Sequence, residues 1–178
     1  MKLIKVMLVD SENEILDNLK SIIPWRKNGF EIVAKTTVSN DALDLYKSHR
    51  PEIVITDIWM PGLNGLDLSK KILSIDNLTK IIFLTSYKDI EFAKFTISLG
   101  ASNYLLKHEL SKNKLLNELN ILRNLIEKEN KRKRISKRYL LKSLMANSFD
   151  LVYGNELQYL YDSNKNNLFS IFLLKIDS

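Results

Sequence analysis

The sequence predicts an α/β fold, a doubly wound parallel sheet of five strands followed by a long helical connector. Five short apolar segments rich in β-branched residues recur over about the first 110 residues, and such strands suit a parallel sheet covered on both faces. Segments with helical spacing alternate with them, which favours right-handed βα crossovers. Beyond residue 110 the alternation gives way to the heptad spacing of a long helix.

The first half of the alternation runs from the N-terminus to residue 56. Strands are assigned to continuous apolar runs, and helices to stretches whose apolar residues recur every three to four positions. The elements expected, in order, are Leu3–Val9, Asn13–Ile23, Phe30–Ala34, Asp41–Tyr46 and Ile53–Thr56. Pro24 ends the first helix, since proline cannot continue it. Ser39 or Asn40 is the expected N-cap of the second helix.

The second half follows a turn marked by Gly62 and Gly65. Its expected elements are Leu66–Ile75, Ile81–Leu84, Ile90–Leu99, ended by Gly100, and Tyr104–Leu106. A sheet of this kind binds ligands beyond the carboxyl ends of its strands. Four polar residues are expected at that edge, namely Asp10, Asp57, Thr85 and Lys107.

The C-terminal third has a different pattern. Apolar residues spaced 4-3-4 between Leu115 and Ile126, with more beyond, predict one long helix or two abutting ones over about 111–146. This seam fits either a last helix packed on the sheet or a linker that pairs in a dimer. Leu168–Ile176 predicts a strand that has no partner in the chain. We therefore expect a domain at 1–125, a helical linker able to form a coiled coil at 126–146, and the truncated start of another domain at 147–178.

Composition excludes several classes of protein. Of the 178 residues 45% are hydrophobic and 27% charged, which excludes a largely disordered chain. The absence of cysteine excludes disulfides, thiolate metal sites and cysteine nucleophiles, and fits a cytoplasmic location. No apolar run approaches the roughly 18 residues of a membrane span, and the N-terminus is too short and too charged for a signal peptide, so we expect no membrane partner.

The net charge of +6 lies entirely in the C-terminal part. Residues 1–109 hold 14 basic and 14 acidic residues, whereas residues 128–142 hold eight basic residues and one acid, Glu129. The run Lys131–Arg134 has two interpretations. It is either the solvated surface of a connecting helix or a surface that contacts nucleic-acid phosphates.

The residues expected at the sheet edge suit phosphoryl chemistry. The carboxylates of Asp10 and Asp57 provide oxygen ligands of the kind Mg²⁺ prefers. Asp57 is the best candidate nucleophile, since a carboxylate can form an aspartyl phosphate. Thr85 can donate a hydrogen bond to a phosphoryl oxygen, and Lys107 can neutralise its charge. Phosphoryl transfer needs mainly positioning and charge neutralisation, which these groups supply.

Four stretches together resemble the receiver domain of two-component response regulators over about 1–125. They are VMLVDSE at 6–12, IVITDIWMPG at 53–62, IIFLT at 81–85 and ASNYLLK at 101–107. The resemblance implies the flavodoxin-like strand order 2-1-3-4-5. Details at Pro24-Trp25, Thr56–Ile58 and Tyr104–Lys107 resemble the subgroup whose regulators end in an AraC-type helix-turn-helix domain, which would bind DNA and is not part of this chain.

The resemblance implies roles for the matched residues. Asp57 would be the phosphoacceptor for a sensor histidine kinase, with Lys107 binding the phosphoryl group. Asp10, Asp57 and the backbone carbonyl of Trp59 would hold Mg²⁺. Thr85 and Tyr104 would be the switch pair, altering the face of the fourth helix, fifth strand and fifth helix. A homodimer would form through that face or through the helix at 111–146.

Two positions differ from the family pattern. Ser11 stands where the family usually has a second acid, so we expect weakened Mg²⁺ binding, since ligand charge sets affinity. Glu12 either begins the first helix or turns into the acidic pocket and partly replaces that acid. His108 follows Lys107 where the family usually has proline, so we expect a trans bond there and an altered loop.

Two alternatives to a phosphorylated regulator follow. Ser11 and His108 favour a degenerate receiver that acts as a dimerisation and binding module whatever its phosphorylation state. A phosphatase resembling the haloacid dehalogenases would also use a strand-end aspartate and Mg²⁺. That family has Asp-x-Asp after its first strand, whereas here the first strand ends Asp10-Ser11-Glu12 and the best nucleophile follows the third. We therefore expect no enzyme.

Overall fold

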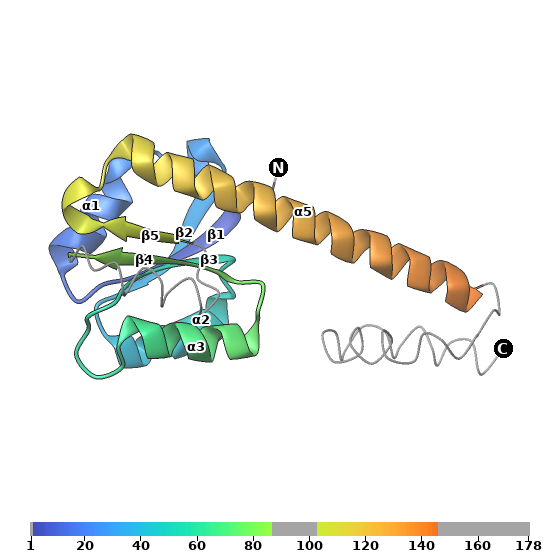
Figure 1. Ribbon diagram of the computed structural model, residues 1–178, viewed down its shortest axis with the longest axis horizontal. Helices are drawn as coiled ribbons and strands as arrows, with labels where there is room; N and C mark the ends of the chain where they lie inside the picture. Colours follow the sequence, from blue (N-terminus) through green and yellow to red (C-terminus); the bar gives the residue numbers. More distant parts are fainter. Residues whose placement is uncertain (1, 87–102, 146–178) are drawn as a thin grey trace. The chain divides into compact units, whose positions relative to one another are not determined.

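The computed structural model describes residues 2–86 and 103–145 (Figure 1). The helix predicted at Ile90–Leu99, the strand predicted at Leu168–Ile176 and the domain predicted at 147–178 lie outside the described residues. By its contacts the chain forms two compact units, Met1–Glu129 and Asn130–Ser178. The first unit contains the sheet.

Five parallel strands form one sheet in the order β2-β1-β3-β4-β5. They are β1 (Ile4–Val9), β2 (Phe30–Thr36), β3 (Ile53–Asp57), β4 (Lys80–Thr85) and β5 (Asn103–Leu106). The predicted fold class and strand order are confirmed. Because all strands run the same way, their carboxyl ends meet at one edge.

Helices cover both faces of this sheet. They are α1 (Asn13–Ile22), α2 (Ser39–His49), α3 (Gly65–Ile75) and α5 (Lys112–Met145), with short 3₁₀ helices η1 (Arg26–Asn28) and η2 (Lys107–Glu109). In Figure 1, α1 and the start of α5 lie on one face, and α2 and α3 lie on the other. The C-terminal pattern is thus one continuous helix of 34 residues. None of the helices described here combines the length and hydropathy that crossing a membrane requires.

The apolar residues divide into two cores, one on each face. Along β1, Val6 and Leu8 join the first core, whereas Met7 and Val9 join the second. This explains why the strands read as continuous apolar runs, since both faces of the sheet are buried. The spaced residues of α5, Leu115, Leu119, Leu122 and Ile126, all belong to the first core. The seam therefore packs on the sheet.

Two charged side chains of α5 add to this packing. The guanidinium of Arg123 lies over the Phe30 ring, 4.5 Å from its centroid, and donates to the carbonyl of Asn28. Six residues further along the helix, Glu129 forms an ion pair with Lys80 at the start of β4, with 2.8 Å between the charged atoms. The first unit thus extends along the helix to residue 129.

The predicted N-cap of the second helix is wrong. Val38 occupies the N-cap of α2, without a side-chain capping bond, and Ser39 is the first helical residue. The Ser39 hydroxyl instead donates to the Pro61 carbonyl at 2.8 Å and accepts from the Leu63 amide at 3.2 Å. A tertiary contact has outcompeted local capping, and it ties α2 to the loop after β3.

Candidate functional site

The predicted site residues meet at the carboxyl edge of the sheet. Asp10 follows β1, Asp57 ends β3, Thr85 ends β4, and Lys107 follows β5. The first three are 1%, 5% and 4% exposed. Buried polar side chains need hydrogen-bond partners, and residues gathered at one edge of the sheet can provide them for one another.

Lys107 joins three carboxylates. Its ammonium nitrogen Nζ lies 3.0 Å from Asp10 Oδ1, 2.8 Å from Glu12 Oε1 and 2.9 Å from Asp57 Oδ2. The Lys107 side chain is only 8% exposed, so its charge-assisted hydrogen bonds to Asp10 and Asp57 lie largely out of water, whereas the Glu12 side chain is 59% exposed. Residues spread over almost a hundred positions of sequence therefore converge on one cation.

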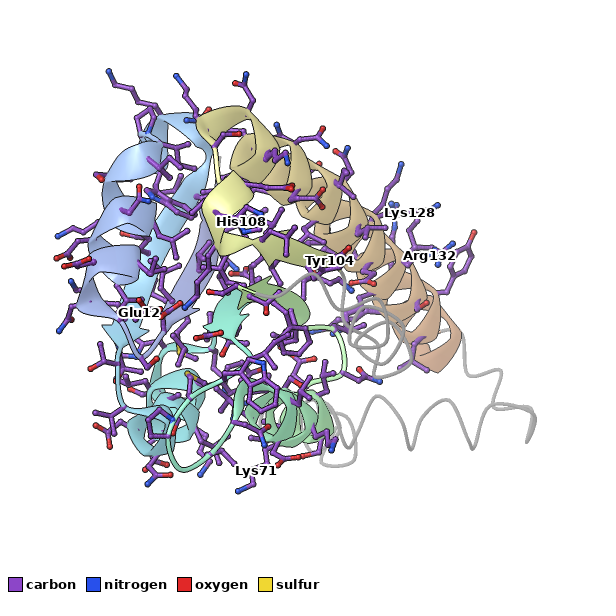
Figure 2. All side chains as sticks on the ribbon, turned by 60° about the vertical axis from the view of Figure 1, so that its left-hand side comes forward. Glu12, Lys71, Tyr104, His108, Lys128 and Arg132 are labelled. Atoms are coloured by element: carbon purple, nitrogen blue, oxygen red, sulfur yellow. The ribbon has the colours of Figure 1, made fainter. Side chains whose placement is uncertain are left out.

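Glu12 has both of the placements that the sequence suggested, at the start of α1 and turned into the acidic pocket. It is the N-cap residue of α1, and its backbone amide donates to Asp10 Oδ1 at 3.0 Å. Its carboxylate nevertheless turns toward Lys107, and ligand atoms of Asp10, Glu12 and Asp57 all lie within 4.8 Å of one another. Ser11 is exposed. Figure 2 labels Glu12 beside the start of α1. Among residues 2–86 and 103–145 the acidic cluster thus has three members, with Glu12 as the third.

The cluster shifts the pKa values of two of its members. Burial raises the pKa of Asp10, although the hydrogen bond from Lys107 and that from the Glu12 amide oppose the change. Burial alone would lower the pKa of Lys107, but its hydrogen bonds to the three carboxylates outweigh burial and raise it. Lys107 is therefore a permanent cation at neutral pH.

The residues present fit a divalent cation. Within the described residues, Asp10 Oδ2 is buried without a hydrogen-bond partner, and its 2.9 Å contact with the Lys107 ammonium lacks hydrogen-bond geometry. When all three carboxylates are ionised, they carry two more negative charges than the single positive charge of the ammonium balances. Mg²⁺ would balance that excess, and carboxylate oxygens are its preferred protein ligands.

The loop after β3 positions Asp57. The Trp59 amide donates to Asp57 Oδ1 at 3.2 Å, and the Gly65 amide donates to the Ile58 carbonyl at 3.0 Å. A Cβ atom on Gly65 would lie 1.9 Å from the Asp57 carbonyl oxygen, so only glycine fits where α3 begins. The sequence marks Gly65 as a turn residue, but not its contact with Asp57.

Comparison with known proteins identifies this arrangement. Residues 6–120 match the sequence family described as the response regulator receiver domain. The chain belongs to this family. Receiver domains are signalling modules that bind Mg²⁺ through an acidic cluster, here Asp10, Glu12 and Asp57.

Individual relatives agree with this assignment. Over 103 residues the chain is 42% identical to the transcriptional regulatory protein HptR of Staphylococcus aureus (strain NCTC 8325 / PS 47), covering 58% of this chain and 40% of HptR. It is 36% identical over 103 residues to YesN, an uncharacterized transcriptional regulatory protein of Bacillus subtilis (strain 168), covering 58% of this chain and 28% of YesN. The match spans less than half of either relative.

A solved structure agrees as well. The receiver domain of AraT, a response regulator from Geobacillus stearothermophilus, superposes with a TM-score of 0.63 at 27% identity. The superposition covers 74% of this chain and 98% of that one. The doubly wound sheet is therefore the fold of a receiver domain.

The remaining predicted residues of the receiver lie on β4 and β5. Register pairs Phe83 with Tyr104 and Thr85 with Leu106, so Thr85 and Tyr104 share one face of the sheet, two residues apart along the strands. Thr85 is buried, whereas Tyr104 is 37% exposed. The structure thus places Thr85 at the carboxyl end of β4, on the sheet edge that carries the acidic cluster, and the Tyr104 ring at the surface of β5, where Figure 2 labels it.

The segment after Lys107 differs from the usual family sequence. Residues Lys107–Glu109 form η2, and no peptide bond in residues 2–86 or 103–145 is cis. The trans bond predicted between Lys107 and His108 is therefore confirmed. The ammonium still reaches all three carboxylates from this backbone.

Proposed function

We propose that this receiver is phosphorylated on Asp57 by a sensor histidine kinase and controls transcription through a DNA-binding output. The observation that carries the proposal is the convergence of Asp57, Asp10 and Lys107 at the sheet edge, with the two acids and the ammonium within hydrogen-bond reach. The names of HptR and YesN support regulation of transcription. The AraC-type output and its DNA contacts belong to this proposal.

In the transfer step, an Asp57 carboxylate oxygen attacks the phosphorus of a phosphohistidine. A P–O bond forms, the P–N bond breaks, and the electron pair stays with the kinase imidazole, which takes up a proton. The Trp59 amide and Lys107 hold the two Asp57 oxygens before attack, which orients the carboxylate. Lys107 then stabilises charge on the transferred phosphoryl oxygens.

Asp10, Asp57 and the backbone carbonyl of Trp59 would hold Mg²⁺, with Glu12 as a further acidic group. The ion supplies charge neutralisation for the phosphoryl oxygens. Its affinity is lowered because Ser11 carries no charge and because the Glu12 side chain is 59% exposed, so that water screens its attraction.

Phosphorylation would shift a two-state equilibrium of the receiver. The Thr85 hydroxyl would donate to a phosphoryl oxygen, and Tyr104 on the same face would change position. This would alter a face to which β5 and α5 contribute, together with the helix that the sequence predicts at Ile90–Leu99. A homodimer through that face, or through α5, would carry the change to the output.

Incubation with Mg²⁺ and acetyl phosphate, followed by intact-mass measurement, tests the proposal. We expect a gain of about 80 Da, one phosphoryl group, that EDTA prevents. The matched control is Asp57→Asn, which keeps the size of the side chain and removes the nucleophile. Absence of the gain in the wild type, or its persistence in Asp57→Asn, would contradict phosphorylation at Asp57.

A second candidate function is the degenerate receiver, which binds partners without phosphate. The observation favouring it is the neutral Ser11 beside a cluster whose three carboxylates all contact Lys107. Ser11→Asp discriminates, with Ser11→Ala as control. If only Ser11→Asp acquires Mg²⁺-dependent labelling, the wild-type site is degenerate. If wild type is labelled already, this second candidate is rejected.

A further inference from the structure

The part of α5 from Lys128 to Arg138, here called the basic segment, carries concentrated positive charge. Its cationic residues are Lys128, Lys131, Arg132, Lys133, Arg134, Lys137 and Arg138, and all are exposed. Figure 2 shows the labelled Lys128 and Arg132 side chains extending outward from the helix. The phosphorylation site at Asp57 uses none of them.

These charges have no neutralising partners in the described part of the chain. The one acid of the basic segment, Glu129, is already paired with Lys80 at 2.8 Å. None of the seven cations has an ion pair or hydrogen bond to another side chain among the described residues. Like charges also stand four residues apart, as at Lys128 and Arg132, and such pairs destabilise a helix. A bound polyanion would relieve that repulsion.

The charge spacing matches that of a nucleic acid. Ten helical steps from Lys128 to Arg138 span about 15 Å, so the seven cations stand at about one per 2 Å. Double-stranded DNA carries one negative charge per about 1.7 Å of its axis. A helix with this density can neutralise several phosphates and release their counterions, which is the main source of sequence-independent affinity.

The distribution of the cations disfavours a membrane surface. Consecutive helical residues are about 100° apart, so Lys131–Arg134 alone point to all sides of the helix. Within the basic segment the only apolar residue is Ile135. A helix that lies on a lipid surface needs a broad apolar face opposite its charges. The basic segment has charge on every side instead.

We infer that the basic segment binds nucleic-acid phosphates without reading base sequence. The choice of nucleic acid as the polyanion rests on the transcriptional output proposed above. The segment would add an electrostatic contact to DNA held by the output domain.

The test uses the full 178-residue chain and a fluorescein-labelled DNA duplex of about 20 bp and unrelated sequence, followed by anisotropy over about 50–200 mM salt. The variant K131Q/R132Q/K133Q/R134Q removes four charges and keeps helix-forming residues. The matched control K20Q/K27Q/K71Q/K112Q removes four exposed charges elsewhere. Circular dichroism checks that helicity is retained in both.

We expect the slope of log affinity against log salt to become shallower by about 3 and the affinity at the lowest salt to fall at least about tenfold in the first variant only. Equal losses in both variants would overturn the inference, as would absence of duplex binding by wild type. Preferential binding to phosphatidylserine vesicles, or equal competition by polyglutamate at matched charge, would also overturn it.

No phosphodonor is present in this assay, and Asp57→Asn is measured alongside. Duplex binding that persists when Asp57 cannot be phosphorylated supports the inference, whatever the labelling experiment shows. The two proposals therefore fail separately.

Discussion

Replacing Lys107 by methionine should destabilise the receiver substantially. The substitution removes an ammonium held by Asp10, Glu12 and Asp57 and leaves their carboxylates facing one another. Removing one partner of a buried ion pair typically costs about 3–5 kcal/mol. We expect the lower end, about 3 kcal/mol, because the exposed Glu12 contributes little through water.

Urea denaturation followed by circular dichroism measures this loss, in EDTA and again with Mg²⁺. In a separate thermal unfolding measurement in EDTA, the melting temperature should fall by about 6–12 °C for a chain of this size. Mg²⁺ should restore part of the loss, since a divalent cation that binds only the folded state stabilises it. The matched control is Lys114→Met, which breaks the half-exposed pair with Glu109 and should cost under about 1 kcal/mol.

The pH of the measurement follows from the sign of the pKa shift. The pKa of Lys107 is raised in the folded protein above its ordinary 10.5, because its hydrogen bonds outweigh burial. Its stabilising contribution is therefore complete below pH 10.5 and is lost only as the pH rises through the folded value. A neutral buffer reports all of it. If Lys107→Met and Lys114→Met unfold at the same midpoint in EDTA, the reasoning about the buried cluster is refuted.

Three further predictions concern the surroundings of the cluster. Burial raises the pKa of Asp10 above 3.8, so the stability that Asp10 contributes is present below pH 3.8 and is lost as the pH rises through the pKa of the folded protein. The difference in unfolding free energy between wild type and Asp10→Asn should therefore fall between these two pH values. A difference that does not change with pH would contradict this. Gly65→Ala should lower the free energy of unfolding, measured in urea, by about 1–3 kcal/mol and should slow labelling by acetyl phosphate, because the alanine Cβ would overlap the Asp57 carbonyl. A wild-type unfolding free energy together with a wild-type labelling rate would exclude the overlap. Ser39→Ala should cost about 1–2 kcal/mol in the same assay by removing the hydrogen bonds to Pro61 and Leu63, and unchanged stability would show that these bonds are dispensable.

The sheet and most of the site could be predicted because their signals are local. Continuous apolar runs identify strands buried on both faces, and the strict alternation with helices requires the strands to be parallel. Parallel strands bring their carboxyl ends together, so Asp10, Asp57 and Lys107 meet without any long-range signal in the sequence. The topology of the sheet is therefore sufficient to predict where the cluster lies.

Contacts that depend on distant backbone could not be predicted. Ser39 has the composition of an N-cap, yet its hydroxyl serves a loop twenty-two residues away, because that loop offers both a carbonyl and an amide. The close approach of Gly65 to Asp57 is likewise a property of the folded loop. In both cases the sequence identifies a residue suited to polar or tight local geometry, and only the fold shows which neighbour uses it.

Glu12 shows how a receiver with an altered motif keeps the charge of its pocket. Ser11 removes an acid, but the first turn of α1 begins at Asn13, so the Glu12 side chain leaves the backbone where it can reach Lys107. The cluster keeps three carboxylates against one ammonium, an excess that a divalent cation balances. The replacement is incomplete, since Glu12 is 59% exposed whereas Asp10 is 1% exposed, and a screened carboxylate attracts a cation less strongly than a buried one. A pocket that retains its charge in a more hydrated place fits the proposal of Mg²⁺ binding that is weakened and not abolished.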